Sequence, residues 1–305
     1  MNTVRIFISS NPSNLSAKLA EFSSTATVEA EYGDVLVSGS VLTLAHHGAR
    51  SGRPCPCEMD NFPEMGIEAI GLSHFDLDTL GGVMAILGIK PMEWEFWQTA
   101  AFIDIQGPHK LGTLALTTPT VGVGTEDLLN AFWAWSEDNR LFPPRDGSVL
   151  DCTEFFTKAA KFLQYLLKNR RLDEEGHKAI IEAGREWAAI KAALDTDSFV
   201  SHDHEITIRQ SAEFVNHLYR PDSQAVVGFN SGTGAITVSV PDIIPGFSCG
   251  EFLKAQYGPL AGGHAGIGGT PRGTVYSIED AKALALVLAQ DLNNLRMEDL
   301  GPEVR

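Results

Sequence analysis

A short segment, Ser73–Gly82, carries three side chains of metal-ligand type at alternate positions. His74, Asp76 and Asp78 follow the apolar run Ile67–Leu72 and precede a helical pattern. Residues two apart in an extended strand end point the same way, so these side chains would converge at the carboxyl end of a strand, where α/β sheets place their sites. Imidazole and carboxylate ligands suit Mn²⁺, Zn²⁺, Fe²⁺ or Mg²⁺. The alternative is a helix start, with Asp78 as N-cap and Asp76 near the helix dipole.

Further histidines and acids extend this candidate set. His46 and His47 stand where an apolar run ends, and they are interpreted either as metal ligands or as loop residues. Asp34 could bridge metal ions, but the glycine before it is equally typical of a turn. Asp104 and His109 lie on either side of a Gly-Pro helix breaker, and His109 is either a ligand or substrate contact or a polar loop residue.

A glycine-dense segment, Gly258–Gly273, has the composition of an anion-binding loop. Consecutive glycines such as Gly262 and Gly263 let backbone N–H groups approach an oxyanion closely. His264 and Arg272 would add donors that match phosphate. The alternative is a flexible surface loop. The sequence holds neither the glycine-lysine loop of P-loop ATPases nor a nucleophile elbow.

Three segments together resemble the DHH phosphoesterase superfamily, in particular its RecJ-like and exopolyphosphatase-like members. Leu72–Thr79 is similar to the first motif of the family, which has the form HxDxDG. Ala100–Gly107 is similar to a later motif that supplies one metal-binding Asp, here Asp104. Gly262–Gly269 resembles the GGH motif of the DHH-associated C-terminal domain. The resemblance covers short motifs, but their order spans most of the chain.

The resemblance implies a pair of divalent ions, usually Mn²⁺, and a second domain that contacts the substrate phosphate. On this basis the expected metal ligands are His74, Asp76, Asp78, Asp104, His46, His47 and Asp34. The expected catalytic residues are Asp78, His47 and His264. The expected substrate-binding residues are Gly262, Gly263, His264, Arg272 and His109.

The sequence also departs from the family pattern. The Asp-His-His motif of the family normally follows the first motif, whereas His46 and His47 precede it here and Ala45 replaces the Asp. Thr79 stands where this branch often has Gly, and the usual Pro after the GGH motif is missing. A rearranged strand order would still bring both histidines to the ions.

The hydrophobic pattern predicts an α/β protein of two domains. We expect a largely parallel sheet with a helical linker in residues 1–195, a joint at 198–206, and a smaller α/β domain in residues 205–305. The predicted strands are 4–8, 35–37, 41–44, 67–72, 225–229 and 235–240. The predicted helices are 15–22, 79–87, 93–103, 125–135, 153–168, 173–194, 211–218 and 277–295.

The composition narrows the classes of partner and location. The chain has 305 residues with 44% hydrophobic and 20% charged, which is typical of a globular protein. A net charge of −16 argues against binding of long duplex nucleic acid, which is held by Lys and Arg. No apolar run is long enough for a membrane span, and the first residues lack the pattern of a secretory signal. Four cysteines are too few for a disulfide scaffold and favour a reducing cytoplasm.

Two other motifs have metal-like composition but a plainer interpretation. Cys55 and Cys57 are separated by one residue, whereas a structural zinc site needs two to four between paired cysteines, so we interpret both as ordinary cysteines. Ser201–Glu205, which contains two histidines and two acids, lies at the expected domain joint and is interpreted as a solvated linker.

These patterns together predict a metal-dependent phosphoesterase that attacks its substrate with a metal-activated water. The expected substrate is small and phosphorylated: a short oligonucleotide, a nucleotide derivative or inorganic polyphosphate. One alternative is an anion- or nucleotide-binding protein with one metal ion or none, which Ala45 favours. Another is a metal hydrolase that acts on a non-phosphate bond. A homodimer is left open.

Overall fold

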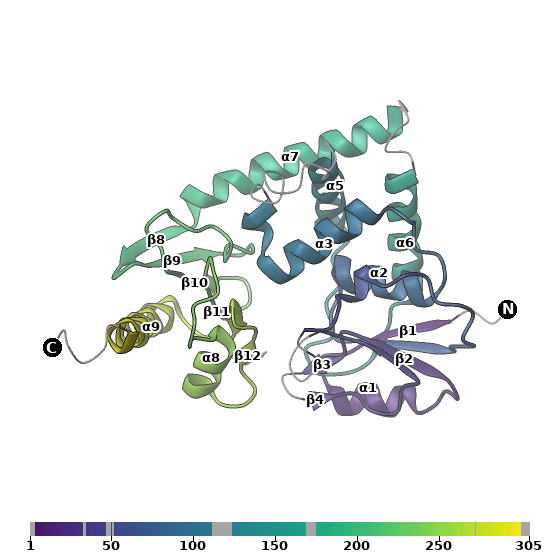
Figure 1. Ribbon diagram of the computed structural model, residues 1–305, viewed down its shortest axis with the longest axis horizontal. Coiled ribbons are helices and arrows are strands. Elements are labelled where there is room, and N and C mark those ends of the chain that lie inside the picture. Colours follow the sequence, from purple (N-terminus) through teal and green to yellow (C-terminus); the bar gives the residue numbers. More distant parts are fainter. Residues whose placement is uncertain are drawn as a thin grey trace. The chain divides into compact units, whose positions relative to one another are not determined.

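The protein folds into two compact units. A computed structural model describes residues 4–32, 35–46, 50, 52–111, 124–168, 175–271 and 273–299. One unit comprises residues 1–105 and 110–189, and the other residues 106–109 and 190–305. Each unit combines helices with a sheet (Figure 1), so the expected α/β class is confirmed. Among the described helices, none combines the length and the hydropathy that a membrane span needs.

The first unit is built on a five-stranded sheet with the strand order β5–β2–β6–β1–β7. Four neighbouring strands are parallel, and β7 pairs antiparallel with β1 at one edge. A separate two-stranded ribbon is formed by β3 and β4. The strands are β1 (Arg5–Ile8), β2 (Thr25–Val28), β3 (Glu31–Tyr32), β4 (Val35–Leu36), β5 (Leu42–Leu44), β6 (Ala69–Leu72) and β7 (Leu150–Asp151).

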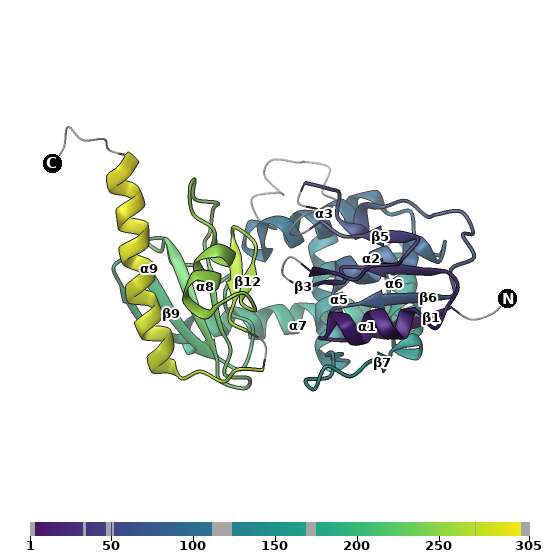
Figure 2. The same cartoon turned by 90° about the horizontal axis from the view of Figure 1, so that it is seen from below.

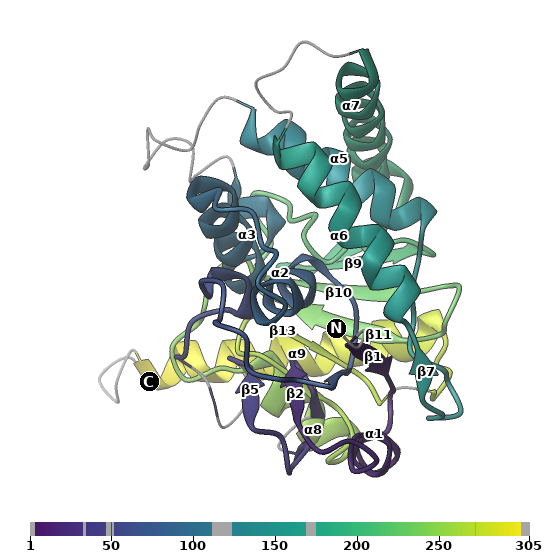
Figure 3. The ribbon, with the colours of Figure 1, turned by 90° about the vertical axis from the view of Figure 1, so that its right-hand side faces the viewer.

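Helices cover both faces of this sheet. Ile6 and Ile8 of β1 belong to the core shared with α2, α3, α5 and α6, whereas Phe7 between them packs with Leu15 and Leu19 of α1. Strands buried on both faces show this division of alternate residues. Figure 3 shows α5 beside α6, and these two helices are in contact. The helices are α1 (Pro12–Leu19), η2 (Pro56–Glu58), α2 (Leu77–Ile86), α3 (Trp94–Gln106), η3 (Pro108–Lys110), α5 (Thr125–Asp138), α6 (Thr153–Lys168) and α7 (Glu175–Asp197).

The second unit contains a six-stranded sheet with the order β12–β13–β11–β10–β9–β8. Only β9 and β10 pair in parallel; the other neighbours are antiparallel. Helices α8 (Cys249–Tyr257) and α9 (Ile278–Asp299) cover the same face of this sheet (Figure 2) and share its core. The strands are β8 (Phe199–Asp203), β9 (Ile206–Ser211), β10 (Ala225–Asn230), β11 (Ile236–Ser239), β12 (Gly262–Gly263) and β13 (Ile267–Gly269).

Two expected segments have a different structure. The helix expected at 211–218 does not form, because β9 runs to Ser211 and the Ser211 hydroxyl then accepts the Glu213 N–H at 3.0 Å in a local turn. The segment expected as a linker at 198–206 instead forms β8 and its turn into β9, where His202 Nδ1 lies 2.9 Å from Thr207 Oγ1. The division between the two units falls within α7.

Two glycines allow the η2 segment to lie directly against α2. A Cβ atom on Gly81 would lie 2.6 Å from the Cβ and 2.8 Å from the Cα of Cys57. A Cβ atom on Gly82 would lie 2.7 Å from the Cβ of Pro56 and 2.8 Å from a methyl of Val28. No larger residue fits at either position without movement of the backbone opposite. The glycines therefore fix where Cys55 to Cys57 sit relative to α2.

We expect Gly81→Ala to lower the free energy of unfolding by about 1–3 kcal/mol, because the added methyl overlaps the Cys57 backbone. The matched control is Gly176→Ala near the start of α7, where the new Cβ would meet only the Tyr165 hydroxyl at 3.2 Å. This control should be unchanged or more stable by up to about 1 kcal/mol, as Ala is the better helix former. Urea unfolding measures both. A Gly81→Ala protein as stable as the wild type would contradict the close packing.

Candidate metal centre

Three adjacent parallel strands end level with one another. Val28, the last residue of β2, pairs with Leu44 at the end of β5 and with Leu72 at the end of β6. Glu29 follows β2 directly, in a left-handed backbone conformation with φ of 47°. His46 lies two residues beyond β5, and its N–H donates to Glu29 Oε1 at 3.3 Å. The carboxyl edge of the sheet therefore gathers side chains that are distant in the sequence.

Four side chains surround the imidazole of His46. Its Nε2 atom lies 3.0 Å from Asp104 Oδ2, 3.6 Å from Asp78 Oδ2 and 3.9 Å from Glu29 Oε1. The sulfur of Cys55 lies 3.5 Å from Nδ1 and 3.8 Å from Nε2. Four of the five residues are buried, while the Asp104 side chain is 25% exposed. We name this group the His46 cluster: Glu29, His46, Cys55, Asp78 and Asp104.

The two carboxylate oxygens of Asp78 have different surroundings. Asp78 Oδ1 accepts the Cys57 N–H at 2.8 Å. Within the described residues, Asp78 Oδ2 is buried without a hydrogen bond. Burial of a carboxylate oxygen in this state is costly unless a cation or donor satisfies it. The arrangement fits a divalent cation bound at Asp78 Oδ2.

The electrostatics of the His46 cluster also fit a cation. Burial raises the pKa of Glu29 to about 7. Burial, followed by the charge of Asp104, raises the pKa of Asp78 well above its usual range. Burial alone would lower the pKa of His46, but the hydrogen bonds to Asp104 and Cys55 raise this pKa to about 11. A protonated imidazole thus supplies positive charge among three carboxylates, which is the charge that a metal ion would bring.

The expected ligands His74 and Asp76 bond to each other. Strand β6 ends at Leu72, so the alternation of an extended strand does not continue through these residues. Asp76 is the N-cap of α2: its Oδ1 accepts the Thr79 N–H at 2.8 Å, and its Oδ2 lies 3.0 Å from His74 Nε2. Burial alone would raise the pKa of Asp76, but the charge of His74 and the hydrogen bonds with His74 and Thr79 lower this pKa to about 2. The cap belongs to Asp76 rather than Asp78, and the ligand role of His74 and Asp76 stays a prediction.

His109 lies in the second unit. Its Nε2 is 3.0 Å from the Pro241 carbonyl oxygen, and its ring meets the Tyr219 ring edge-on with centroids 4.7 Å apart. Its contact with substrate stays a prediction. Three further candidates lie outside the described residues: Asp34, His47 and Arg272.

The GGH segment forms a tight turn between β12 and β13. A Cβ on Gly250 of α8 would lie 2.6 Å from the Gly263 carbonyl oxygen, so α8 packs on β12 backbone to backbone. The His264 N–H donates to the Ile267 carbonyl at 2.6 Å, and the His264 carbonyl accepts the Gly250 N–H at 3.0 Å. These glycines therefore have a packing role. The expected contact of Gly262, Gly263 and His264 with phosphate stays a prediction.

Two members of the His46 cluster were not expected from the sequence. Glu29 follows β2, a four-residue strand with the sequence Thr-Ala-Thr-Val that was not among the predicted strands. The alternation of threonine with Ala26 and Val28 was the one available signal. Cys55 joins the His46 cluster because the η2 turn packs against α2. Its spacing from Cys57 is not that of a metal-binding motif.

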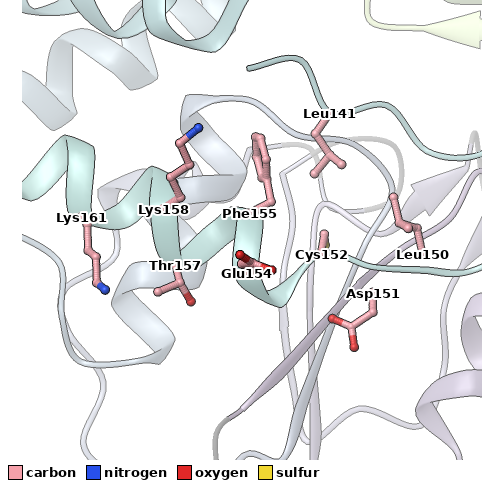
Figure 4. A pocket seen from close by; sticks show the side chains of 9 residues that line it. All are labelled: Leu141, Leu150, Asp151, Cys152, Glu154, Phe155, Thr157, Lys158 and Lys161. Carbon is pink, nitrogen blue, oxygen red and sulfur yellow. The ribbon is translucent and has the colours of Figure 1, made fainter. Parts of the chain in front are cut away.

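A separate open pocket of about 660 Å³ lies where β7 leads into α6 (Figure 4). Leu141 and Phe155 give it an apolar wall, and Lys158 stands at its rim. No residue of the His46 cluster lines this pocket. We therefore do not assign it to the same site.

No known protein-family model matches this sequence, and no curated protein matches it. Among solved structures, the pGpG-specific phosphodiesterase PggH from Vibrio cholerae is similar over 89% of this chain and 99% of its own, with a TM-score of 0.41 and 12% identity. An uncharacterized protein from Helicobacter pylori G27 is similar over 93% and 88%, with a TM-score of 0.22 and 10% identity. Both TM-scores lie below 0.5, so neither similarity indicates a function for this chain.

Removal of the Asp78 charge should stabilise the protein when metal is chelated. We expect Asp78→Asn to raise the free energy of unfolding in EDTA by about 1–3 kcal/mol, because the amide keeps the oxygen that accepts the Cys57 N–H and removes a buried carboxyl that the fold must either ionise at a cost or hold protonated. Exposed Asp60→Asn makes the same charge change and should stay within about 0.5 kcal/mol. Urea unfolding at pH 8 gives both values. Destabilisation by Asp78→Asn would show that its carboxylate is favourably paired without a cation.

Proposed function

We propose that this chain is a metal-dependent phosphohydrolase that acts on a small phosphorylated substrate. The observation that carries the proposal is the His46 cluster, in which two groups of three ligand-type residues share the imidazole of His46. Within each group the ligand atoms lie within 4.8 Å of one another. The cluster lies at the carboxyl ends of parallel strands, where α/β folds place their sites. The resemblance of the segment around His74 to a phosphoesterase motif supports phosphate as the group attacked.

The residues of the cluster have distinct tasks around the ion. Glu29, His46, Asp78 and Asp104 would hold a divalent ion, which would supply a Lewis acid for a phosphoryl oxygen and for bound water. The Cys57 N–H fixes Asp78, so that Oδ2 is presented to the ion. The bond from the His46 N–H to Glu29 Oε1 holds these two ligands in register. Asp104 is the exposed member, so substrate approaches from its side.

The charge of the chain limits the substrate to a small one. With 39 acidic against 23 basic residues, the protein lacks the cations that hold a long nucleic acid. A metal ion supplies local positive charge for one or two phosphates. Short oligonucleotides, nucleotide derivatives and inorganic polyphosphate are therefore the substrates of choice.

A second candidate is a binding protein that holds one ion and does not hydrolyse phosphate. It is favoured by the pairing of His74 with Asp76 at 3.0 Å, because two side chains bonded to each other are less available to a second ion. The two candidates differ in metal stoichiometry: two equivalents per chain favour the hydrolase and one favours the binding protein.

Hydrolysis should depend on metal and on Asp78. The purified protein, loaded in turn with Mn²⁺, Zn²⁺, Fe²⁺ and Mg²⁺, is assayed on pGpG, a chromogenic phosphodiester and polyphosphate. We expect EDTA to abolish turnover reversibly and Asp78→Asn to lower kcat at least about 100-fold, because a charged ligand of the ion is lost. Asp60→Asn should keep wild-type activity. Turnover that survives both EDTA and Asp78→Asn would overturn the proposal.

The ligand role of Asp76 can be separated from its capping role. Asn caps helices as well as Asp does, so Asp76→Asn keeps the cap but loses the ion pair with His74 that lowers the pKa of Asp76. Because this pair is partly exposed, we expect the free energy of unfolding in EDTA to fall by no more than about 1 kcal/mol. If Asp76 binds a second ion, as the resemblance implies, the variant should lose about one metal equivalent per chain, measured by elemental analysis after dialysis. Unchanged metal content would show that Asp76 is a cap only, and would favour the binding protein.

A further inference from the structure

Cys55 places a sulfur atom among the oxygen and nitrogen atoms of the His46 cluster. Its Sγ lies 3.8 Å from His46 Nε2 and 4.0 Å from Asp104 Oδ2. The side chain has no exposed surface. Phosphate chemistry based on Mn²⁺ or Mg²⁺ uses oxygen and imidazole ligands and has no use for a thiol at this position.

The spacing of these atoms is that of one coordination shell. Ligand atoms on a tetrahedral ion lie roughly 3.3–3.6 Å apart, given bonds of about 2.0 Å to nitrogen or oxygen and 2.3 Å to sulfur. From His46 Nε2, the distances to Asp104, Asp78 and Cys55 are 3.0, 3.6 and 3.8 Å. The ligand atoms of His46, Cys55 and Asp104 thus lie close enough together for one ion, whereas Asp78 belongs with Glu29 and His46 to the second ligand group.

The position of Cys55 is fixed by the backbone around it. Its N–H donates to Glu58 Oε2 at 3.0 Å across the η2 turn. The adjoining Pro56 and Cys57 lie against the glycines of α2. The Cys57 sulfur contacts the Trp97 carbonyl oxygen at 3.8 Å, and its thiol also interacts with Cys55 and Asp78. Of the two cysteines of this turn, only Cys55 belongs to a ligand group.

We propose that Cys55 is a thiolate ligand of this centre and that the bound ion is Zn²⁺ rather than the Mn²⁺ that the family resemblance implies. The inference rests on the proposed metal centre and specifies its cofactor. Thiolate ligands favour Zn²⁺ over Mn²⁺ and Mg²⁺, which prefer oxygen. On binding, an S–Zn bond replaces the S–H bond of Cys55, an N–Zn bond replaces the N–H bond at His46 Nε2, and both protons pass to solvent.

The first test uses Co²⁺ as a spectroscopic substitute for Zn²⁺ in the full-length, reduced protein. Sulfur bound to Co²⁺ gives an intense charge-transfer band in the near ultraviolet. We expect the wild type to show this band on titration with Co²⁺ and Cys55→Ser to lose it. Cys152→Ser and Cys249→Ser, which alter buried cysteines outside the ligand groups, should keep it.

The second test compares affinities by calorimetry. Cys55→Ser should weaken Zn²⁺ binding by at least about 100-fold and Mn²⁺ binding by less than about 10-fold, because only the softer ion gains from sulfur. A loss of the same size for both ions would mean that the substitution disturbs the centre as a whole and would count against the proposal.

A measurement without substitution covers the case in which Cys55→Ser does not fold. X-ray absorption of the wild type loaded with one equivalent of Zn²⁺ should show a sulfur neighbour at about 2.3 Å. A shell of only nitrogen and oxygen neighbours, or bound Co²⁺ with no charge-transfer band, would overturn the role of Cys55 and leave the proposed hydrolase standing. Failure to bind Co²⁺, Zn²⁺ and Mn²⁺ alike would remove both.

Discussion

Three carboxylates lie around one imidazole in the first unit, and two of them have almost no contact with solvent. Glu29 and Asp78 are 1% and 4% exposed, so water cannot screen their repulsion. The fold holds them together because Val28 pairs with strands on both of its sides, which leaves no freedom for the strand ends to separate. Backbone hydrogen bonds and core packing thus oppose an electrostatic cost that only positive charge can remove.

The same constraint explains the packing on the other side of the cluster. Asp78 is fixed through the Cys57 N–H, and this contact exists only because Gly81 lets the η2 turn approach α2. A bulkier residue at Gly81 would move the turn and, with it, the donor on which Asp78 depends. The position of the Asp78 carboxylate therefore depends on Gly81, a helix residue without a side chain.

Much of the fold could be predicted from the sequence, and less of the candidate site. Long periodic segments such as α6 coincide with their expected bounds at 153–168. The segment from His74 to Asp78 was found because ligand-type residues are dense there, yet its alternation misled, since the chain leaves the strand at Leu72 and begins α2 at Leu77. Glu29 and Cys55 enter the site through strand register and helix packing, and neither of these can be read from residue types in one sequence.

The close contact between α8 and β12 bears on how such sequences are recognised. A Cβ on Gly263 would lie 2.3 Å from the Ile267 carbonyl oxygen, and one on Gly250 would meet the Gly263 backbone at 2.6 Å. Any chain that folds this ribbon against the start of this helix must keep glycine at both places, whatever it binds. Gly263, directly before the histidine, is therefore required by the packing, whereas a Cβ on Gly262 would meet only the end of the Lys254 side chain at 3.3 Å. In a search for relatives, the histidine and its surroundings are the part of the motif that can discriminate between activities.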